Sequence, residues 1–218
     1  MAWPGELTQP PLPQPVLKHS RTVSSRTPTT TGTRLVARAR KLVGLATLSG
    51  VAPHLTDDCV GFVRTVYEDQ GIDLMSAEMR GDNGVSAMFR LAYERDAIHT
   101  SAPEPGDLVF FRNTYDRNRD GKLNDGLTHV GVVESVNADG TVNFVHRIHG
   151  GVKRGKLLPG APRDLKHNDY LRPAKPNAPL ASTGELFVSY ASASRLATLP
   201  AFSAASPTSS RQAPRGTR

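Results

Sequence analysis

The single cysteine of this 218-residue chain, Cys59, has the position expected of a nucleophile. It falls at the start of segment 57–71, whose apolar residues recur at helical spacing and whose Gly71 is a natural stop. The first turn can be capped by a side-chain oxygen of Thr56, Asp57 or Asp58. Backbone N–H groups at a helix N-terminus favour negative charge, so we expect a lowered pKa of the Cys59 thiol and a reactive thiolate. The alternative is a small core hydrophobe, the commoner role of a lone cysteine.

Two histidines can supply the base that a thiol nucleophile needs. His129 and His146 lie on two expected strands, 129–136 and 141–148, joined by a turn with an Asp-Gly signal. If the turn has an even number of residues, Gly131 faces His146, and the two histidines become diagonal neighbours with Cα atoms about 7 Å apart. One imidazole can then accept the thiol proton while the other orients the first ring.

Other roles for these histidines stay open at this level. A three-residue turn would place His149 opposite His129, so His149 is the fallback partner. The pair could also be half-exposed strand residues without a catalytic role. Zinc is a weaker alternative, because two histidines without helical spacing or a second thiolate are a poor ligand set.

An acidic insertion, 115–127, precedes His129 and resembles a calcium loop. Oxygen donors and a glycine stand at loop positions 1, 3, 5 and 6, namely Asp116, Asn118, Asp120 and Gly121. Leu127 replaces the acid expected at position 12, and Asp125 at position 10 could substitute for it. A bound Ca²⁺ would stiffen the connection to His129 without taking part in catalysis. The alternative is a polar loop whose acids are neutralised by Arg117, Arg119 and Lys122.

The expected elements describe an α+β domain with N-terminal helices packed on an antiparallel sheet and a C-terminal helix. Periodicity predicts helices over 34–45, 59–70, 86–95 and 183–195. Strands are expected over 107–112, 129–136, 141–148, 151–157 and 169–172. We expect one domain over residues 33–197, between a disordered arm at 1–32 and a disordered basic tail at 198–218.

The formal charge of +7 belongs to the ends of the chain: residues 1–40 carry +5, residues 181–218 carry +3, and the middle carries −1. This distribution argues against a folded domain with a basic face for specific nucleic-acid binding. One cysteine excludes an intramolecular disulfide. No apolar run reaches the length of a membrane span, and the first 20 residues lack the apolar core of a secretory signal.

Four motifs in one order resemble the NlpC/P60 and CHAP group of papain-like cysteine peptidases and amidases. They are DCVGFV at 58–63, PGDLVFF at 105–111, HVGVV at 129–133 and FVH at 144–146. The resemblance covers about residues 34–195 and implies the papain-like α+β fold of that group. It also implies cleavage of amide bonds in peptidoglycan stem peptides or cross-links, outside the cytoplasm: in the periplasm, in the cell wall or after secretion.

The resemblance assigns roles to individual residues. Cys59 would be the nucleophile, His129 the base and His146 the orienting third residue, with the Cys59 N–H in the oxyanion hole and no catalytic cofactor. Val60 stands where a serine is usual, and no tyrosine occurs in 44–55, where many NlpC/P60 members carry one. These departures favour the broader CHAP side and leave amidase and endopeptidase activities open.

Two functions of other kinds remain as alternatives. The same thiol chemistry could serve acyl transfer or deamidation of another peptide amide. The fold could also be a non-catalytic module that binds cell wall or calcium. The sequence makes no prediction of oligomeric state.

Overall fold

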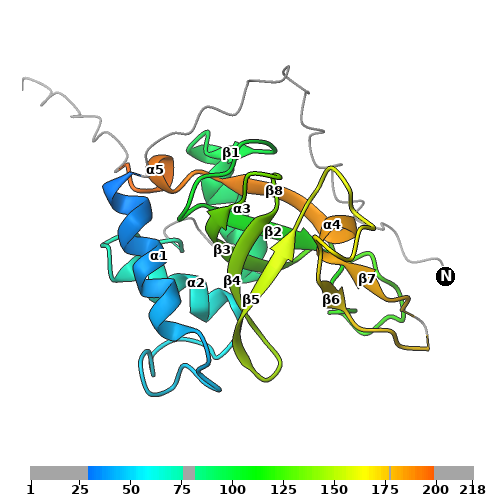
Figure 1. The fold of residues 1–218 in the computed structure, drawn as a ribbon. Coiled ribbons are helices and arrows are strands. Elements are labelled where there is room, and N and C mark those ends of the chain that lie inside the picture. Colours follow the sequence, from blue (N-terminus) through cyan, green and yellow to red (C-terminus); the bar gives the residue numbers. More distant parts are fainter. Residues whose placement is uncertain (1–28, 76–81, 177, 199–218) are drawn as a thin grey trace, which may run out of the picture.

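Three helices precede a meandering sheet in the structure, a computed structural model that describes residues 29–75, 82–176 and 178–198 (Figure 1). The helices are α1 (Thr30–Leu42), α2 (Cys59–Glu68) and α3 (Gly84–Glu94). Each begins after a residue whose side chain accepts a backbone N–H of the first turn, namely Thr29, Asp58 and Asn83. None of the helices in these ranges is long and apolar enough to cross a membrane.

The main sheet has six antiparallel strands in the order β1-β8-β2-β3-β4-β5. Its strands are β1 (Ile98–His99), β2 (Leu108–Arg112), β3 (Leu127–Val136), β4 (Val142–Ile148), β5 (Gly151–Leu157) and β8 (Phe187–Ala191). A two-stranded sheet, β6 (Tyr170–Arg172) and β7 (Ala181–Ser182), lies at the side away from α1 (Figure 1). Helices followed by an antiparallel sheet confirm the α+β class.

Alternation along β2 divides the core into two parts. Leu108 and Phe110 join the cluster between the sheet and the helices, with Phe62 of α2 and Met88 of α3. Val109 and Phe111 face the other way and pack with the buried residues Phe144, Leu186 and Tyr190. Both faces of the sheet are therefore covered, which makes β2, β3 and β4 a rigid platform.

The predicted C-terminal helix over 183–195 is wrong. Only two short helices form there, α4 (Thr183–Leu186) and α5 (Ala193–Leu196), and β8 lies between them. Phe187–Ala191 pairs with β2 on one side and β1 on the other, so pairing in the sheet outweighs the local helical pattern.

The first helix begins at Thr30 and is capped by Thr29, so it starts inside the arm that was predicted to be disordered. The rest of that prediction, residues 1–28, lies outside the described residues. So does the predicted basic tail from residue 199 onward.

The hairpin β3–β4 has the predicted register near the histidines but a register shifted by one residue near the turn. An even turn that sets Gly131 opposite His146 also pairs Val132 with Val145 and Val136 with Thr141. The first of these pairs forms, but Val136 pairs with Val142 instead. A bulge between Val133 and Ser135 accounts for the one-residue difference. The shift of register at the turn and the bulge therefore cancel before the strand reaches the histidines.

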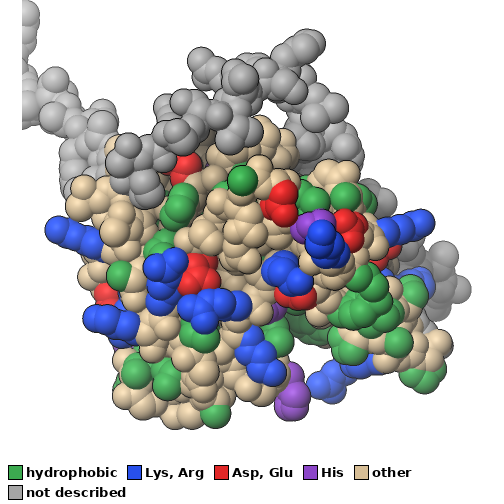
Figure 2. Space-filling model, viewed as in Figure 1, with side chains coloured by type: hydrophobic (Ala, Val, Ile, Leu, Met, Phe, Trp, Pro, Cys, Tyr) green, Lys and Arg blue, Asp and Glu red, His purple; other side chains and the backbone are tan. Residues whose placement is uncertain are grey.

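Glu134 occupies this bulge and is buried between two arginines. Its carboxylate accepts Nε of Arg40 at 2.7 Å and Nε of Arg154 at 2.7 Å. These contacts join α1 and β5 to the bulge. Figure 2 shows basic side chains beside acidic ones on the face that carries α1 and β5.

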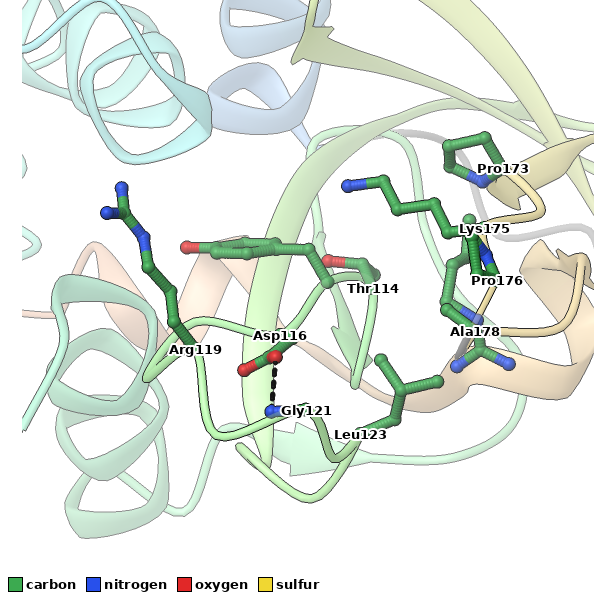
Figure 3. Close-up of a pocket in the computed structure, with 11 residues that line it drawn as sticks. Thr114, Asp116, Arg119, Gly121, Leu123, Pro173, Lys175, Pro176 and Ala178 are labelled. Carbon is green, nitrogen blue, oxygen red and sulfur yellow. Dashed lines mark hydrogen bonds between the residues drawn. The ribbon is translucent and has the colours of Figure 1, made fainter.

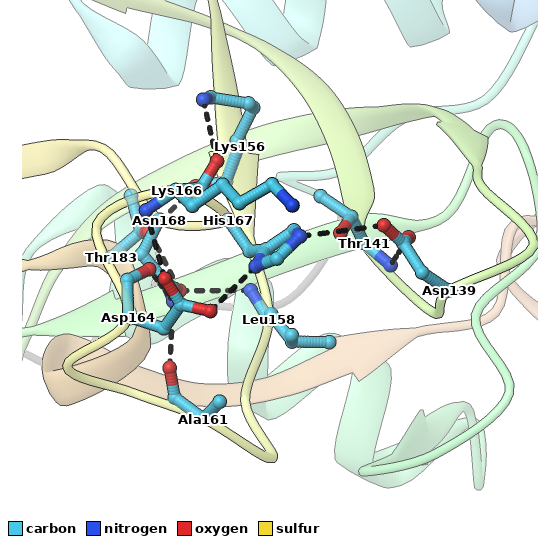
Figure 4. A network of polar contacts seen from close by, with 10 residues as sticks. All are labelled: Asp139, Thr141, Lys156, Leu158, Ala161, Asp164, Lys166, His167, Asn168 and Thr183. Carbon is cyan, nitrogen blue, oxygen red and sulfur yellow. Dashed lines mark hydrogen bonds and ion pairs between the residues drawn. The ribbon is translucent and has the colours of Figure 1, made fainter.

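A second polar network ties the segment before β6 to the β3–β4 turn (Figure 4). The ring of His167 lies between two carboxylates, with Nδ1 2.6 Å from Asp164 and Nε2 3.5 Å from Asp139. Asn168 accepts the N–H of Leu158 and donates to the carbonyl of Ala161. This network fixes the segment before β6, and the residues that follow β6 line a cavity beside the acidic loop.

Candidate active site

Cys59 is the first residue of α2, and its surroundings hold it there tightly. Oδ1 of Asp58 accepts the N–H of Gly61 at 2.9 Å, which closes the first turn. A Cβ atom at Gly61 would lie 1.7 Å from the carbonyl oxygen of Thr56, so only glycine fits. The start of the helix is thus packed against the preceding loop.

A salt bridge joins this helix start to the strand that carries His146. Asp57 accepts Nε and Nη2 of Arg147, at 3.0 and 2.8 Å. It also accepts the N–H of Leu48. Arg147 and this N–H lower the pKa of Asp57 to about 2, so the bridge stays charged over the whole working pH range.

The two predicted histidines are brought together. Nε2 of His129 lies 3.0 Å from Nδ1 of His146, and both side chains are buried. Gly131 makes room for them, because a Cβ atom there would lie 2.9 Å from the carbonyl oxygen of Val145 and 3.3 Å from Cβ of His146. His149, the fallback partner, lines the same cleft, but the described contacts of His129 include His146 and not His149.

Cys59 and His129 line one cleft of about 600 Å³. The backbone N–H of Val130, the residue that follows His129, acts to lower the pKa of the thiol. Because Nε2 of His129 is taken by His146, Nδ1 is the ring nitrogen that remains for the thiol proton. The arrangement brings a candidate nucleophile, a candidate base and a candidate orienting group to one site.

Burial reverses the expected pKa of the nucleophile. Desolvation, and after it the charge of Asp58, raise the pKa of the Cys59 thiol to about 12, although the N–H groups of Val130, Cys59 and Val60 act in the opposite direction. The helix start therefore does not produce a free thiolate, contrary to the sequence-based expectation. Desolvation likewise lowers the pKa of His129 to about 4, and that of His146 well below its ordinary value.

Because of these pKa shifts, Cys59 rests at neutral pH as a thiol beside two neutral imidazoles. For Nδ1 of His129 to accept a proton, Nε2 must carry the ring hydrogen and donate it to Nδ1 of His146. His146 can then hold the ring of His129 in place and stabilise it when it becomes charged. Proton transfer and nucleophilic attack must therefore be coupled.

Tyr115 is a cleft residue that the sequence-based reasoning did not select. It lines the cleft with Cys59, and burial together with the charge of Cys59 raises the pKa of its hydroxyl. The preceding residue, Thr114, is fixed by its N–H to Oγ1 of Thr128 at 2.8 Å. Asn113 and Gly126 bond to each other across the base of the loop. Only the fold shows that this closure brings a tyrosine into the cleft that Cys59 lines.

The acidic loop closes on itself through its own backbone. Asp116 accepts the N–H of Gly121, Asn118 that of Asp120, and Asp120 that of Lys122. The second carboxylate oxygen of Asp116 is buried and has no hydrogen-bond partner, as a cation ligand would be. However, no group of three or more His, Cys, Asp or Glu residues suited to a metal occurs in the described parts of the chain. The donor set therefore fits calcium only in part.

Comparison with known proteins agrees with this geometry. Residues 51–147 match the model of the CHAP domain, and this segment runs from just before Cys59 to just beyond His146. A search of curated proteins gave no match. CHAP domains are generally hydrolytic on peptidoglycan, which suggests amidase or peptidase activity and a site of action outside the cytoplasm. Residues 51–147 thus carry a match to the CHAP domain, a domain family of peptidoglycan hydrolases and amidases.

Proposed function

We propose that this protein is a cysteine hydrolase that cleaves amide bonds in the stem peptides or cross-links of peptidoglycan. Cys59 is the nucleophile, His129 the base and His146 its orienting partner. The observation that carries the proposal is the 3.0 Å contact between His129 and His146, buried beside the cleft that Cys59 lines. Half-exposed strand histidines would not need this pairing.

The first step is attack by sulfur. Nδ1 of His129 takes the thiol proton while Sγ of Cys59 bonds to the carbonyl carbon, and the carbonyl π electrons move to oxygen. The imidazolium formed on His129 keeps its Nε2–H bond to His146. Transfer at the moment of attack is required because the pKa of the thiol is raised to about 12.

The second half of the cycle returns the proton. The tetrahedral oxyanion collapses, the C–N bond breaks, and His129 gives its proton to the leaving amine, which leaves a thioester on Cys59. Water, deprotonated by His129, attacks that thioester. The C–S bond then breaks, and the leaving thiolate of Cys59 takes the proton back from His129. The products are a carboxylic acid and an amine, with the protein unchanged.

Two donors would stabilise the oxyanion in this mechanism. The backbone N–H of Cys59 lies at the free end of α2, and Tyr115 lines the same cleft. Tyr115 would take the role of the tyrosine absent from 44–55. Tyr115→Phe should lower kcat at least tenfold with little change in Tm, because it removes one donor and no packing. Unchanged kcat would exclude the hydroxyl from the reaction.

Mass spectrometry of digested peptidoglycan tests the main proposal. Wild-type protein should release new muropeptide fragments, whereas Cys59→Ala, with the same Tm, should release none. Fragments from both proteins would exclude the thiol mechanism. Absence of fragments from either protein, together with incorporation of a labelled acceptor amine by the wild type, would point to acyl transfer instead.

The proposal extends to the acidic loop. Asp116, Asn118 and Asp120 would supply oxygen ligands to a calcium ion, which would hold the loop and the residues at its base in one conformation. The buried, unpartnered oxygen of Asp116 supports this role. Catalysis itself would need no cofactor.

A further inference from the structure

A second cavity, of about 520 Å³, adjoins the catalytic cleft. It lies between the acidic loop and the chain that follows β6 (Figure 3). Thr114 and Tyr115 line both spaces. A substrate held at Cys59 therefore has groups within reach of this cavity.

The cavity is cationic. Its charged lining consists of Arg119, Arg172 and Lys175 against one acid, Asp116. Lys175 extends toward the side of the cavity that carries Arg119 (Figure 3). Within the described residues, neither Arg119 nor Lys175 forms an ion pair, and the guanidinium of Arg172 donates to the carbonyls of Asn113 and Pro179 instead of to a carboxylate. Three basic residues thus line one space with a single acid among them.

The backbone that carries these cations is held in place. The N–H and carbonyl of Lys175 bond to those of Ala178, at 2.8 and 3.0 Å. Arg119 stands at a turn with φ of 62°, inside the loop closed by Asp116 and Gly121. A ligand would therefore meet partly fixed cations, which reduces the entropy lost on binding.

We propose that this cavity is a substrate subsite for a free carboxylate of the peptide whose amide bond is cleaved at Cys59. The proposal rests on the hydrolase function proposed above. Stem peptides carry carboxylates on their acidic residues and at their ends, and a carboxylate is the group that Arg and Lys bind best in such a site. Leu123 and Pro173 also line the cavity, and their apolar side chains can pack against the aliphatic part of the residue that bears the carboxylate.

A disaccharide–tetrapeptide from peptidoglycan is the probe, together with derivatives in which one carboxylate at a time is converted to a carboxamide. With the wild type, amidation of the recognised carboxylate should raise KM about tenfold to a hundredfold. Lys175→Met should remove most of that difference, and the double variant with Arg119→Met should remove it entirely, with kcat unchanged. Lys122→Met, an exposed lysine of the same loop outside the cavity, should keep the wild-type discrimination.

Binding to Cys59→Ala, measured by calorimetry, separates this proposal from the hydrolase proposal. If no probe is cleaved, tighter binding of the acid than of the amide, lost in Cys59→Ala/Lys175→Met, would still establish the subsite. The subsite would be refuted if acid and amide bind equally, if neither binds, or if Lys175→Met keeps the discrimination.

Discussion

Asp58→Asn removes the charge next to the nucleophile while it keeps the helix cap. Oδ1 of Asp58 accepts the N–H of Gly61 at 2.9 Å, and asparagine caps helices about as well as aspartate. The carboxylate raises the pKa of the Cys59 thiol, second only to burial. Loss of one neighbouring unit charge should therefore lower this pKa by about one unit, which corresponds to about 1.4 kcal/mol.

Because the chain has one cysteine, an aromatic disulfide reagent reports on Cys59 alone. At neutral pH, far below the thiol pKa of about 12, a one-unit fall gives about tenfold more thiolate, while each thiolate becomes about threefold less nucleophilic. Asp58→Asn should therefore react about threefold faster, with nearly unchanged Tm. Glu94→Gln, the same charge change at the exposed end of α3, is the control and should react at the wild-type rate.

Unchanged or slower labelling of a folded Asp58→Asn protein would refute the role given to this charge. A wild-type labelling rate that reaches a plateau below neutral pH would refute the neutral thiol–imidazole pair itself, because a plateau marks a thiolate that has already formed. Peptide turnover should not rise with labelling. The charge of Asp58 also raises the pKa of His129, so its removal weakens the base.

Three further predictions concern stability. His129 has a pKa of about 4 when folded and about 6.5 when unfolded, so the unfolded state binds more protons between these two pH values. The free energy of unfolding, measured by urea denaturation, should therefore fall by about 3 kcal/mol as the pH drops through this window. A flat profile would contradict the burial of a neutral ring. Gly131→Ala should cost about 1–3 kcal/mol in the same assay and reduce kcat, since the new Cβ atom meets the Val145 carbonyl at 2.9 Å; full activity would contradict the close packing of the histidine pair. Ca²⁺ should raise Tm in the wild type and not in Asp116→Asn; equal shifts in both would exclude this loop as the site.

The histidine pair could be predicted because it depends on strand alternation, which is a local property. Its register was nevertheless correct only because two irregularities cancel. The bulge at Glu134 is stabilised by Arg40 and Arg154, one from α1 and one from β5. Ion pairs between residues so distant in sequence leave no periodic signal, so the bulge could not be predicted.

Two other predictions failed because tertiary contacts outweighed the local sequence pattern on which they were based. Residues 187–191 have apolar spacing that suits a helix, yet they fill the gap between β1 and β2 as a strand. The helix start at Cys59 does direct N–H groups at the thiol, but desolvation by the rest of the fold outweighs them. Position along the chain singled out Cys59 as the candidate nucleophile, whereas the pKa of its thiol depends on tertiary burial.

The acidic loop shows a different division between sequence and fold. Its pattern of oxygen donors predicted a calcium site. Tyr115 lines both the cleft and the cavity and Arg119 lines the cavity, but neither belongs to a motif that the sequence alone would single out. Closure at Asn113–Gly126 and Thr114–Thr128 places Tyr115 beside Cys59 and Arg119 across a cavity from Lys175. In the proposed mechanism, the sheet and α2 would hold the bond-breaking groups rigidly, and Arg119 of the loop would contribute to the contacts that select the substrate. Changes at Arg119 should therefore alter KM and substrate preference, whereas changes at His129 or His146 should abolish turnover for every substrate.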